Sequence, residues 1–143
     1  MYVESNVDTN KALVRRFVDE VFVAGASDGV DDLVAPDFVP HSWPGTGPGP
    51  AELKRAMARV FAGLSDVRMT IEDMVAEGDK VAVRLTAEAT HTGEFMGMPA
   101  SGKSYRIAEI HIFRIADGRI AEHWGQADLL GMMGQLGATP GRP

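Results

Sequence analysis

The stretch EIHIFRIADGRIAEHWGQAD, residues 109–128, decides the expected fold. Two apolar runs flank the turn sequence Ala116-Asp117-Gly118, and aspartate followed by glycine between such runs is a strong hairpin signal. The stretch therefore predicts two antiparallel strands, residues 104–115 and 119–128, joined by a tight turn.

The turn type decides which polar side chains of this hairpin share a face. A two-residue type I′ turn at Asp117-Gly118 would put His111 and His123 on opposite faces. A three-residue loop with Gly118 in the left-handed conformation of a G1 bulge would put them on one face, in the group Glu109, His111, Phe113 and His123. We favour the second register because it gathers the ionisable side chains. A slip of one residue would invert every side chain.

A second pair of strands is predicted before this hairpin. Apolar and polar residues alternate from Val67 to Glu72 and again from Val81 to Ala89, with a turn at residues 77–80. Alternation with period two is typical of half-buried strands, so the chain continues as an antiparallel meander.

The N-terminal part of the chain has helical periodicity instead. Amphipathic spacing predicts helices over residues 10–24 and 51–64 and a short helical piece over 30–34, which ends at Ala35-Pro36. Residues 40–50, PHSWPGTGPGP, contain too many prolines and glycines for a helix or central strand, so they are predicted to form a loop.

Helices followed by a strand meander, without βαβ alternation, favour an α+β fold in which N-terminal helices pack on a strongly curved antiparallel sheet. The length of 143 residues fits a single domain over residues 1–143. A small-molecule pocket is expected between the helices and the sheet.

Composition excludes several classes of function. The chain has no cysteine, which removes thiolate catalysis and disulfides, and its net charge of −6 without a basic run argues against nucleic acid as a partner. No signal peptide and no stretch near the ~20 apolar residues of a membrane span are present, so we expect a cytoplasmic protein without membrane contact.

The predicted hairpin carries the candidate catalytic residues. Histidine titrates near neutrality and a nearby carboxylate can orient it, so Glu109, His111, His123 and Asp128 are suited to proton transfer without a cofactor. The alternative is that these side chains are ordinary sheet residues bonded to the backbone or to each other.

Other polar residues are weaker candidates. His41 and Trp43 lie on the loop that can cap the pocket, and His91 lies at a strand end, open to solvent. A metal site of histidines and carboxylates is disfavoured because no H-x-H, H-x-E or HExxH spacing is present. We therefore expect neither a metal nor a cofactor. Apolar pocket walls are expected from Phe17, Phe95, Phe113 and Trp124.

Four segments together resemble a known family. They are NKALVRRFVDEVF, FVPHSWPGTGPGPAELKRAM, ATHTGEFMGMPASGKSY and HIFRIADGRIAEHWGQADLLGMMGQLG, in this order and covering nearly the whole chain. The sequence resembles the SnoaL-like polyketide cyclases of the nuclear transport factor 2-like superfamily, and the ending from Asp117 is the most specific part.

The resemblance implies a cone-shaped α+β barrel, also called cystatin-like, that forms a homo-oligomer, a dimer or tetramer, through sheet faces. It implies cofactor-free intramolecular aldol closure of aromatic polyketide methyl esters, with a histidine that falls on His111. The family's catalytic aspartate falls on Gly125, which does not match. His123 or Asp128 then replaces it as base, or the chemistry differs, or the protein only binds.

Three hypotheses follow. The first is a SnoaL-like cyclase or isomerase that acts by acid-base chemistry on a hydrophobic carbonyl compound. The second is a non-catalytic small-molecule binding protein, and the third is an oligomeric interaction module with an empty pocket.

Overall fold

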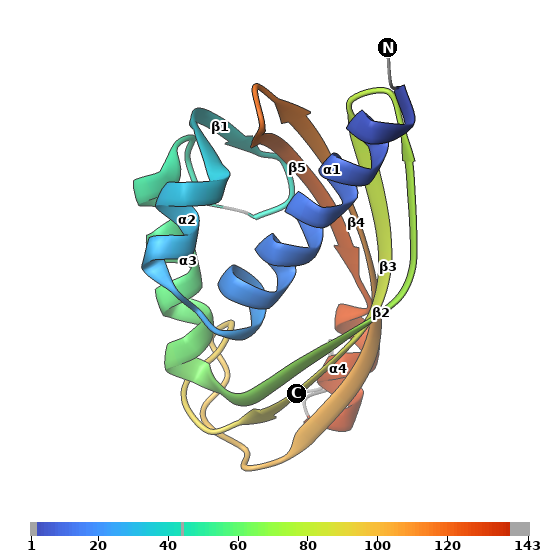
Figure 1. The fold of residues 1–143 in the computed structure, drawn as a ribbon. Coiled ribbons are helices and arrows are strands. Elements are labelled where there is room, and N and C mark those ends of the chain that lie inside the picture. Colours follow the sequence, from blue (N-terminus) through green and yellow to red (C-terminus); the bar gives the residue numbers. More distant parts are fainter. Residues whose placement is uncertain (1–2, 44, 138–143) are drawn as a thin grey trace.

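The N-terminal helices of the protein lie on one side of a curved sheet. The computed structural model describes residues 3–43 and 45–137, with side chains from residue 6 onward. Figure 1 shows α1 lying across the sheet, α2 and α3 side by side, and α4 at the opposite end of the molecule from β1. The helical elements are α1 (Val3–Phe17), η1 (Val18–Val23), α2 (Ser27–Leu33), α3 (Pro50–Gly63) and α4 (Leu129–Gln135).

The sheet has five strands in the order β1-β5-β4-β3-β2. Their bounds are β1 (Val34–Pro40), β2 (Leu64–Glu77), β3 (Lys80–His91), β4 (Ser104–Ala116) and β5 (Arg119–Ala127). The strands from β2 to β5 form the predicted antiparallel meander, whereas β1 runs parallel to β5. The expectation of a purely antiparallel sheet is thus corrected: the α+β cone has a mixed, open sheet.

The strand β1 also corrects the interpretation of residues 30–40. Helix α2 ends at Leu33, and Val34 already belongs to the strand. Two prolines lie in this strand, at positions 36 and 40, which obscured its pattern in the sequence. Proline is tolerated here because β1 is the edge of the sheet, where an unpaired side of the strand needs no N–H donors.

The first predicted helix is present but changes geometry along its length. It is α-helical up to Phe17 and continues as a π-helical segment to Val23. Wider π turns often occur at functional sites. This segment directs Phe22 toward the histidines of the sheet, with its ring centroid 5.3 Å from that of His111.

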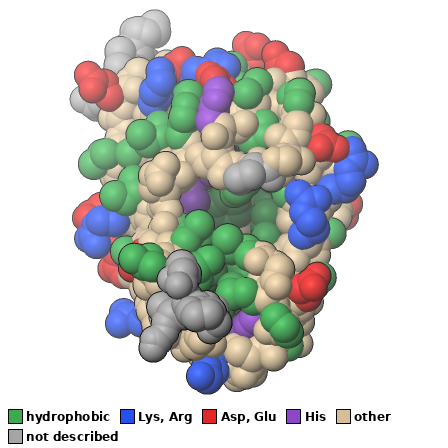
Figure 2. All heavy atoms as spheres, turned by 180° about the vertical axis from the view of Figure 1, so that it is seen from behind, with side chains coloured by type: hydrophobic (Ala, Val, Ile, Leu, Met, Phe, Trp, Pro, Cys, Tyr) green, Lys and Arg blue, Asp and Glu red, His purple; other side chains and the backbone are tan. Residues whose placement is uncertain are grey.

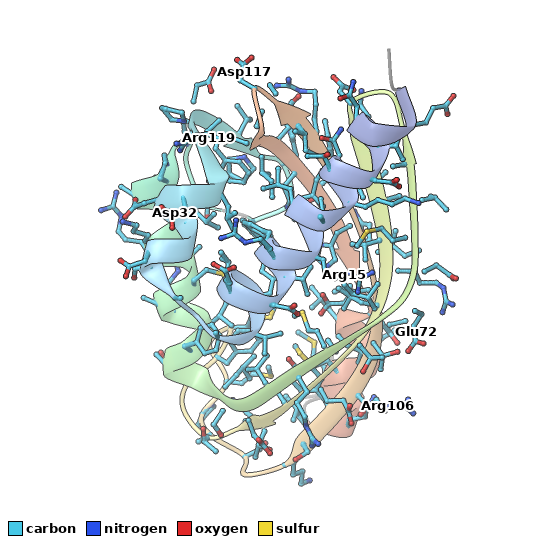
Figure 3. The ribbon with its side chains drawn as sticks, viewed as in Figure 1. Arg15, Asp32, Glu72, Arg106, Asp117 and Arg119 are labelled. Carbon is cyan, nitrogen blue, oxygen red and sulfur yellow. The ribbon has the colours of Figure 1, made fainter. Side chains whose placement is uncertain are left out.

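The core lies between α1, η1 and the concave face of the sheet. Val14 and Phe17 of α1 are fully buried, as are Val81 and Val83 at alternate positions of β3. Charged side chains other than Glu109 lie mostly at the surface, as Glu72, Arg106 and Asp117 do at the rim of the view in Figure 3. Alternation in the sequence therefore assigned the inner face of β3 correctly.

The hairpin of β4 and β5 reaches the favoured register by another route. Asp117 and Gly118 both have positive φ, 52° and 73°, and Ala116 pairs with Arg119, as in a two-residue type I′ turn. The predicted three-residue loop was wrong.

A bulge farther along restores the predicted face. Ile115 pairs with Ile120 and Arg114 with Glu122, so Ala121 is an extra residue in β5. Beyond this bulge Phe113 pairs with His123, which places the two histidines of the hairpin on one face as predicted.

Candidate functional site

A cavity of about 830 Å³ opens between the concave face of the sheet, η1, α3 and the loops 41–49 and 92–103. Figure 2 shows a hollow with hydrophobic and histidine side chains in its wall. Its lining is mainly apolar, and the ionisable groups at its inner end come from the hairpin: Glu109, His111 and His123.

These three side chains form a continuous hydrogen-bonded chain. Nε2 of His111 lies 2.8 Å from Oε1 of Glu109, and Nδ1 of His111 lies 2.8 Å from Nε2 of His123. The His123 residue is fully buried, and the His111 and Glu109 side chains are only 8% and 12% exposed. We call this chain of residues the relay.

With Glu109 ionised and His111 neutral, the hydrogen bonds of the relay assign the protons on the ring nitrogens. An ionised carboxylate only accepts, so Nε2 of His111 donates to Glu109. In neutral His111, Nδ1 is then an acceptor, which receives the Nε2–H of His123. This leaves Nδ1 of His123 as a bare lone pair, and this buried atom has no hydrogen-bond partner among residues 3–43 and 45–137.

Aromatic side chains enclose this last imidazole. Trp43 of the loop stacks on His123 with ring centroids 4.6 Å apart, and Phe113 lies 5.0 Å away. Burial lowers the pKa of His123 well below its ordinary value of 6.5, and a positive charge placed on nearby His111 or His41 lowers it further. His123 is therefore neutral at physiological pH.

The relay depends on the absence of a side chain at Gly125. Gly125 pairs with His111 across the hairpin, and a Cβ placed on it would lie 2.7 Å from Nδ1 of His111 and 3.0 Å from Cε1 of His123. Its N–H donates to Oγ of Ser42 at 2.6 Å. The imidazole pair thus occupies the space into which a side chain at this position would project.

A second histidine–carboxylate pair joins His41, in the loop after β1, to Glu122 of β5. Nε2 of His41 is 2.8 Å from Oε2 of Glu122, whose other oxygen accepts from Arg114. The bond from Arg114 lowers the pKa of Glu122 most, and the bond from His41 lowers it further. The His41 ring also stacks on Trp124 at 4.8 Å and reaches the cavity wall. We call His41 and Glu122 the outer pair. Arg114 is the cation that shares its carboxylate.

The predicted pocket residues divide into two groups. His41, Trp43 and Phe95 line the cavity, whereas Phe17 and Phe113 belong to the buried core and do not line it. Trp124 supports His41 and is also absent from the lining. His91, expected in solvent, is buried, with Nδ1 bonded to Oγ of Ser101 at 2.9 Å.

Asp128 is not brought to the other candidate catalytic residues. It is the exposed N-cap of α4, and its Oδ1 accepts the N–H of Gly131 at 2.8 Å. A carboxylate there satisfies one of the unpaired donors of the first helical turn. The structure therefore gives Asp128 a structural role and leaves it out of the cavity lining.

The sequence interpretation missed Tyr105, which lines the same cavity from β4. Burial and the charge of Glu109 raise its pKa to about 12, so the phenol stays protonated. The sequence could have indicated this position of Tyr105, because alternate residues of a strand share a face and Tyr105 is in step with Glu109 and His111.

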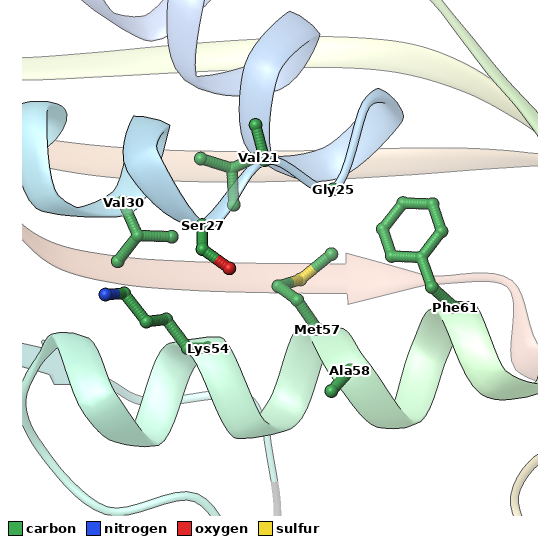
Figure 4. A pocket seen from close by; sticks show the side chains of 9 residues that line it. Val21, Gly25, Ser27, Val30, Lys54, Met57, Ala58 and Phe61 are labelled. Carbon is green, nitrogen blue, oxygen red and sulfur yellow. The ribbon is translucent and has the colours of Figure 1, made fainter.

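A smaller hollow of about 100 Å³ lies between η1, α2 and α3 (Figure 4). Among its lining residues only Lys54 is ionisable, and that amine pairs with Asp31 at 2.8 Å. The large cavity is therefore the one with groups suited to chemistry.

A cone-shaped α+β fold with an apolar cavity and polar groups at its inner end defines a class of small-molecule-binding proteins. Residues 12–136 match the family described as SnoaL-like polyketide cyclase. The chain belongs to this family, which confirms the resemblance drawn from its sequence.

Curated relatives and solved structures agree with this membership. A nogalonic acid methyl ester cyclase of Streptomyces nogalater is 29% identical over 119 residues, covering 81% of this chain and 89% of the relative. The aklanonic acid methyl ester cyclase AcmA of Streptomyces galilaeus is 32% identical over 132 residues, covering 88% and 89%. The structure of TsrD from Streptomyces laurentii superposes with a TM-score of 0.84 at 32% identity, covering 92% and 96%.

Within the described part of the chain, none of the helices combines the length and the apolar character that crossing a membrane requires.

Proposed function

We propose that this protein closes a ring by cofactor-free intramolecular aldol addition in a hydrophobic polyketide methyl ester. Two observations support the proposal: the names of the relatives, and a relay that ends in a bare, buried nitrogen beside an apolar cavity. The bare Nδ1 of His123 is the observation on which the mechanism rests.

In the proposed step, Trp43 moves off His123, whose Nδ1 is sealed from the cavity while the two rings are stacked. This nitrogen then removes a proton from a carbon between two carbonyl groups. The resulting enolate carbon forms a bond to a second carbonyl carbon of the same molecule, and that carbonyl oxygen becomes an alkoxide. The alkoxide then takes the proton back from His123. Atoms and charge balance without an oxidant, a reductant or a second substrate.

The relay explains how a histidine with a lowered pKa can act as a base. When Nδ1 of His123 gains the proton, its Nε2–H moves across the 2.8 Å hydrogen bond to Nδ1 of His111. The positive charge then lies on His111, next to the carboxylate of Glu109. His123 stays neutral throughout, so the cost of charging a fully buried imidazole is avoided.

Gly125 is consistent with this assignment. The resemblance places the family's catalytic aspartate at this position, and here the imidazole pair fills the space instead. We infer that His123 takes the role of that aspartate. Asp128, the other candidate from the sequence, lies outside the cavity lining.

The test is the substitution His123→Gln, with Asp128→Asn as matched control. Turnover of aklanonic acid methyl ester should fall by about a hundredfold or more, the usual contribution of general base catalysis, while the Kd of the ester changes by less than about tenfold. Asn caps a helix as well as Asp, so the control should keep its rate. Unchanged turnover in His123→Gln, or equal loss in both variants, would refute the assignment of the base.

We also propose that the protein is a cytoplasmic homo-oligomer. The outer face of β4 supports association between copies, because Ile110 and Ile112 are exposed there. Large exposed apolar side chains on a sheet face favour burial against another surface.

A further inference from the structure

Tyr105 lies far along the cavity wall from the base. It precedes His111 by six residues on β4, which is about 20 Å along an extended strand. It pairs with Ala89 of β3, whereas His111 pairs with Val83 near the other end of the same ladder. The cavity is thus bordered by polar groups at two separate places on one strand.

The cavity wall around Tyr105 is mainly apolar. The lining residues from this end of the sheet include Leu64 and Val67 of β2, Phe95 of the loop 92–103, and Ala127 and Leu129 of the last strand and helix. The carboxylates of Glu88 and Glu94 also line the cavity. The side chain of Tyr105 is only 8% exposed, so its ring contributes to this wall.

The hydroxyl of Tyr105 is unused within the protein. No hydrogen bond joins it to another residue in 3–43 or 45–137, although buried tyrosine hydroxyls usually find a partner. Two side-chain polar atoms in residues 3–43 and 45–137 are fully buried and lack a hydrogen-bond partner: Nε2 of His91 and Nδ1 of His123. The hydroxyl of Tyr105 is not one of them, so it is not fully buried. The hydroxyl therefore faces the open volume of the cavity.

We propose that Tyr105 is a substrate-binding residue, whose hydroxyl donates a hydrogen bond to an acceptor oxygen at the end of the substrate remote from the reacting carbon. This inference rests on the proposed function of the cavity. It implies a long substrate, with one carbonyl group at His123 and a carbonyl, ether or phenol oxygen that reaches Tyr105.

The electrostatics of the site agree with a donor at this position. Burial and the nearby Glu109 charge raise the pKa of Tyr105 to about 12, so its proton is available at any physiological pH. The carboxylate of Glu109 itself is already bonded to His111 and is four residues away on the strand.

The test is the substitution Tyr105→Phe, which removes the hydroxyl and keeps the ring in the wall. Ser104→Ala is the matched control, because it removes the neighbouring hydroxyl, which bonds to Thr90 and does not line the cavity. Binding is measured by quenching of tryptophan fluorescence with aklanonic acid methyl ester, in the wild type and in the His123→Gln background.

We expect Tyr105→Phe to raise Kd and KM by about three- to tenfold, the equivalent of one hydrogen bond, with kcat unchanged. Ser104→Ala should change neither constant. If Tyr105→Phe binds the ester as tightly as the wild type, the inference is wrong even where turnover is observed. If its Kd rises but the wild type has no turnover, the inference stands and the proposed function fails. An ester that does not bind at all overturns both.

Discussion

The hairpin of β4 and β5 takes part in two histidine–carboxylate pairs, one within the hairpin and one with His41 of the loop after β1. The two pairs have the same hydrogen-bond length and different surroundings. His111 and Glu109 lie 2.8 Å apart on the inner face, and His41 and Glu122 lie 2.8 Å apart on the outer side. The inner side chains are 8% and 12% exposed, compared with 37% and 22% for the outer ones.

The two pairs have the same geometry and differ in their environment. Arg114 shares the outer carboxylate, and solvent screens the charges of the outer pair. The pair therefore contributes little to the free energy of folding, and its role is to attach His41 to the sheet. Among residues 3–43 and 45–137 no lysine or arginine pairs with the inner carboxylate, so its charge is available for an imidazolium on His111. Only the inner pair continues to a second imidazole and a bare nitrogen.

The largest expected effect comes from removing one carboxylate charge from each pair. Glu109→Gln should lower kcat for aklanonic acid methyl ester by about a hundredfold, because the relay loses the charge that stabilises His111 when it is protonated. Glu122→Gln, the matched change, should lower kcat by less than about threefold. Steady-state kinetics of both variants test the comparison, and similar losses in the two would abolish it.

A smaller effect is expected from filling the space beside the inner pair. Gly125→Ala puts a Cβ 2.7 Å from Nδ1 of His111, so it should reduce stability by about 1–3 kcal/mol and turnover by about tenfold or more. Gly134→Ala is the control, since a Cβ in that helical position meets no atom within 4 Å. The control should gain up to about 1 kcal/mol. Urea unfolding measures both, and a Gly125→Ala variant as stable and active as the wild type would contradict the packing argument.

The smallest effect is the pH dependence of stability. Burial keeps the pKa of His123 well below 6.5 in the folded state, while the unfolded chain binds a proton near 6.5. The unfolded state therefore holds more protons below this pH, and the free energy of unfolding falls as pH drops from about 6.5, by at most about 1.4 kcal/mol per unit from this group.

Urea unfolding between pH 7.5 and 5.5 tests this dependence. His123→Gln should flatten the fall, whereas His41→Gln should keep it, because His41 lies outside the relay and its side chain is 37% exposed. Parallel curves for the wild type and His123→Gln would show that the buried imidazole does not contribute.

Local patterns predicted much of the framework. Alternation placed the ends of β3 and β4 within two residues of their observed bounds, and the helix predicted from residue 51 begins at Pro50. Such features depend on neighbours in the sequence, which is why one chain suffices to predict them. The edge strand β1 was missed because its pairing with β5 involves residues more than eighty positions away.

The candidate site was predicted in part. Parity along the strands grouped Glu109, His111 and His123, and the structure brings these three together. The structure places Asp128 apart from them. Its carboxylate made it a candidate base like Glu109, but here it caps helix α4. Tyr105 was overlooked because a lone tyrosine in an apolar strand pattern gives no sign that its hydroxyl is free.

By itself the sequence determined the α+β class, the meander and the presence of two imidazoles in one hairpin, because each of these follows from residue types at short spacing. The tertiary structure decided that the imidazoles meet. That outcome depends on one bulged residue, Ala121, which compensates for the two-residue turn. It depends also on Trp43 and Phe22, which come from distant segments and bury the relay. Gly125, which has no side chain, leaves the space that the two imidazoles occupy. Burial and contact between distant segments are properties of the packed chain, so no local pattern can specify them.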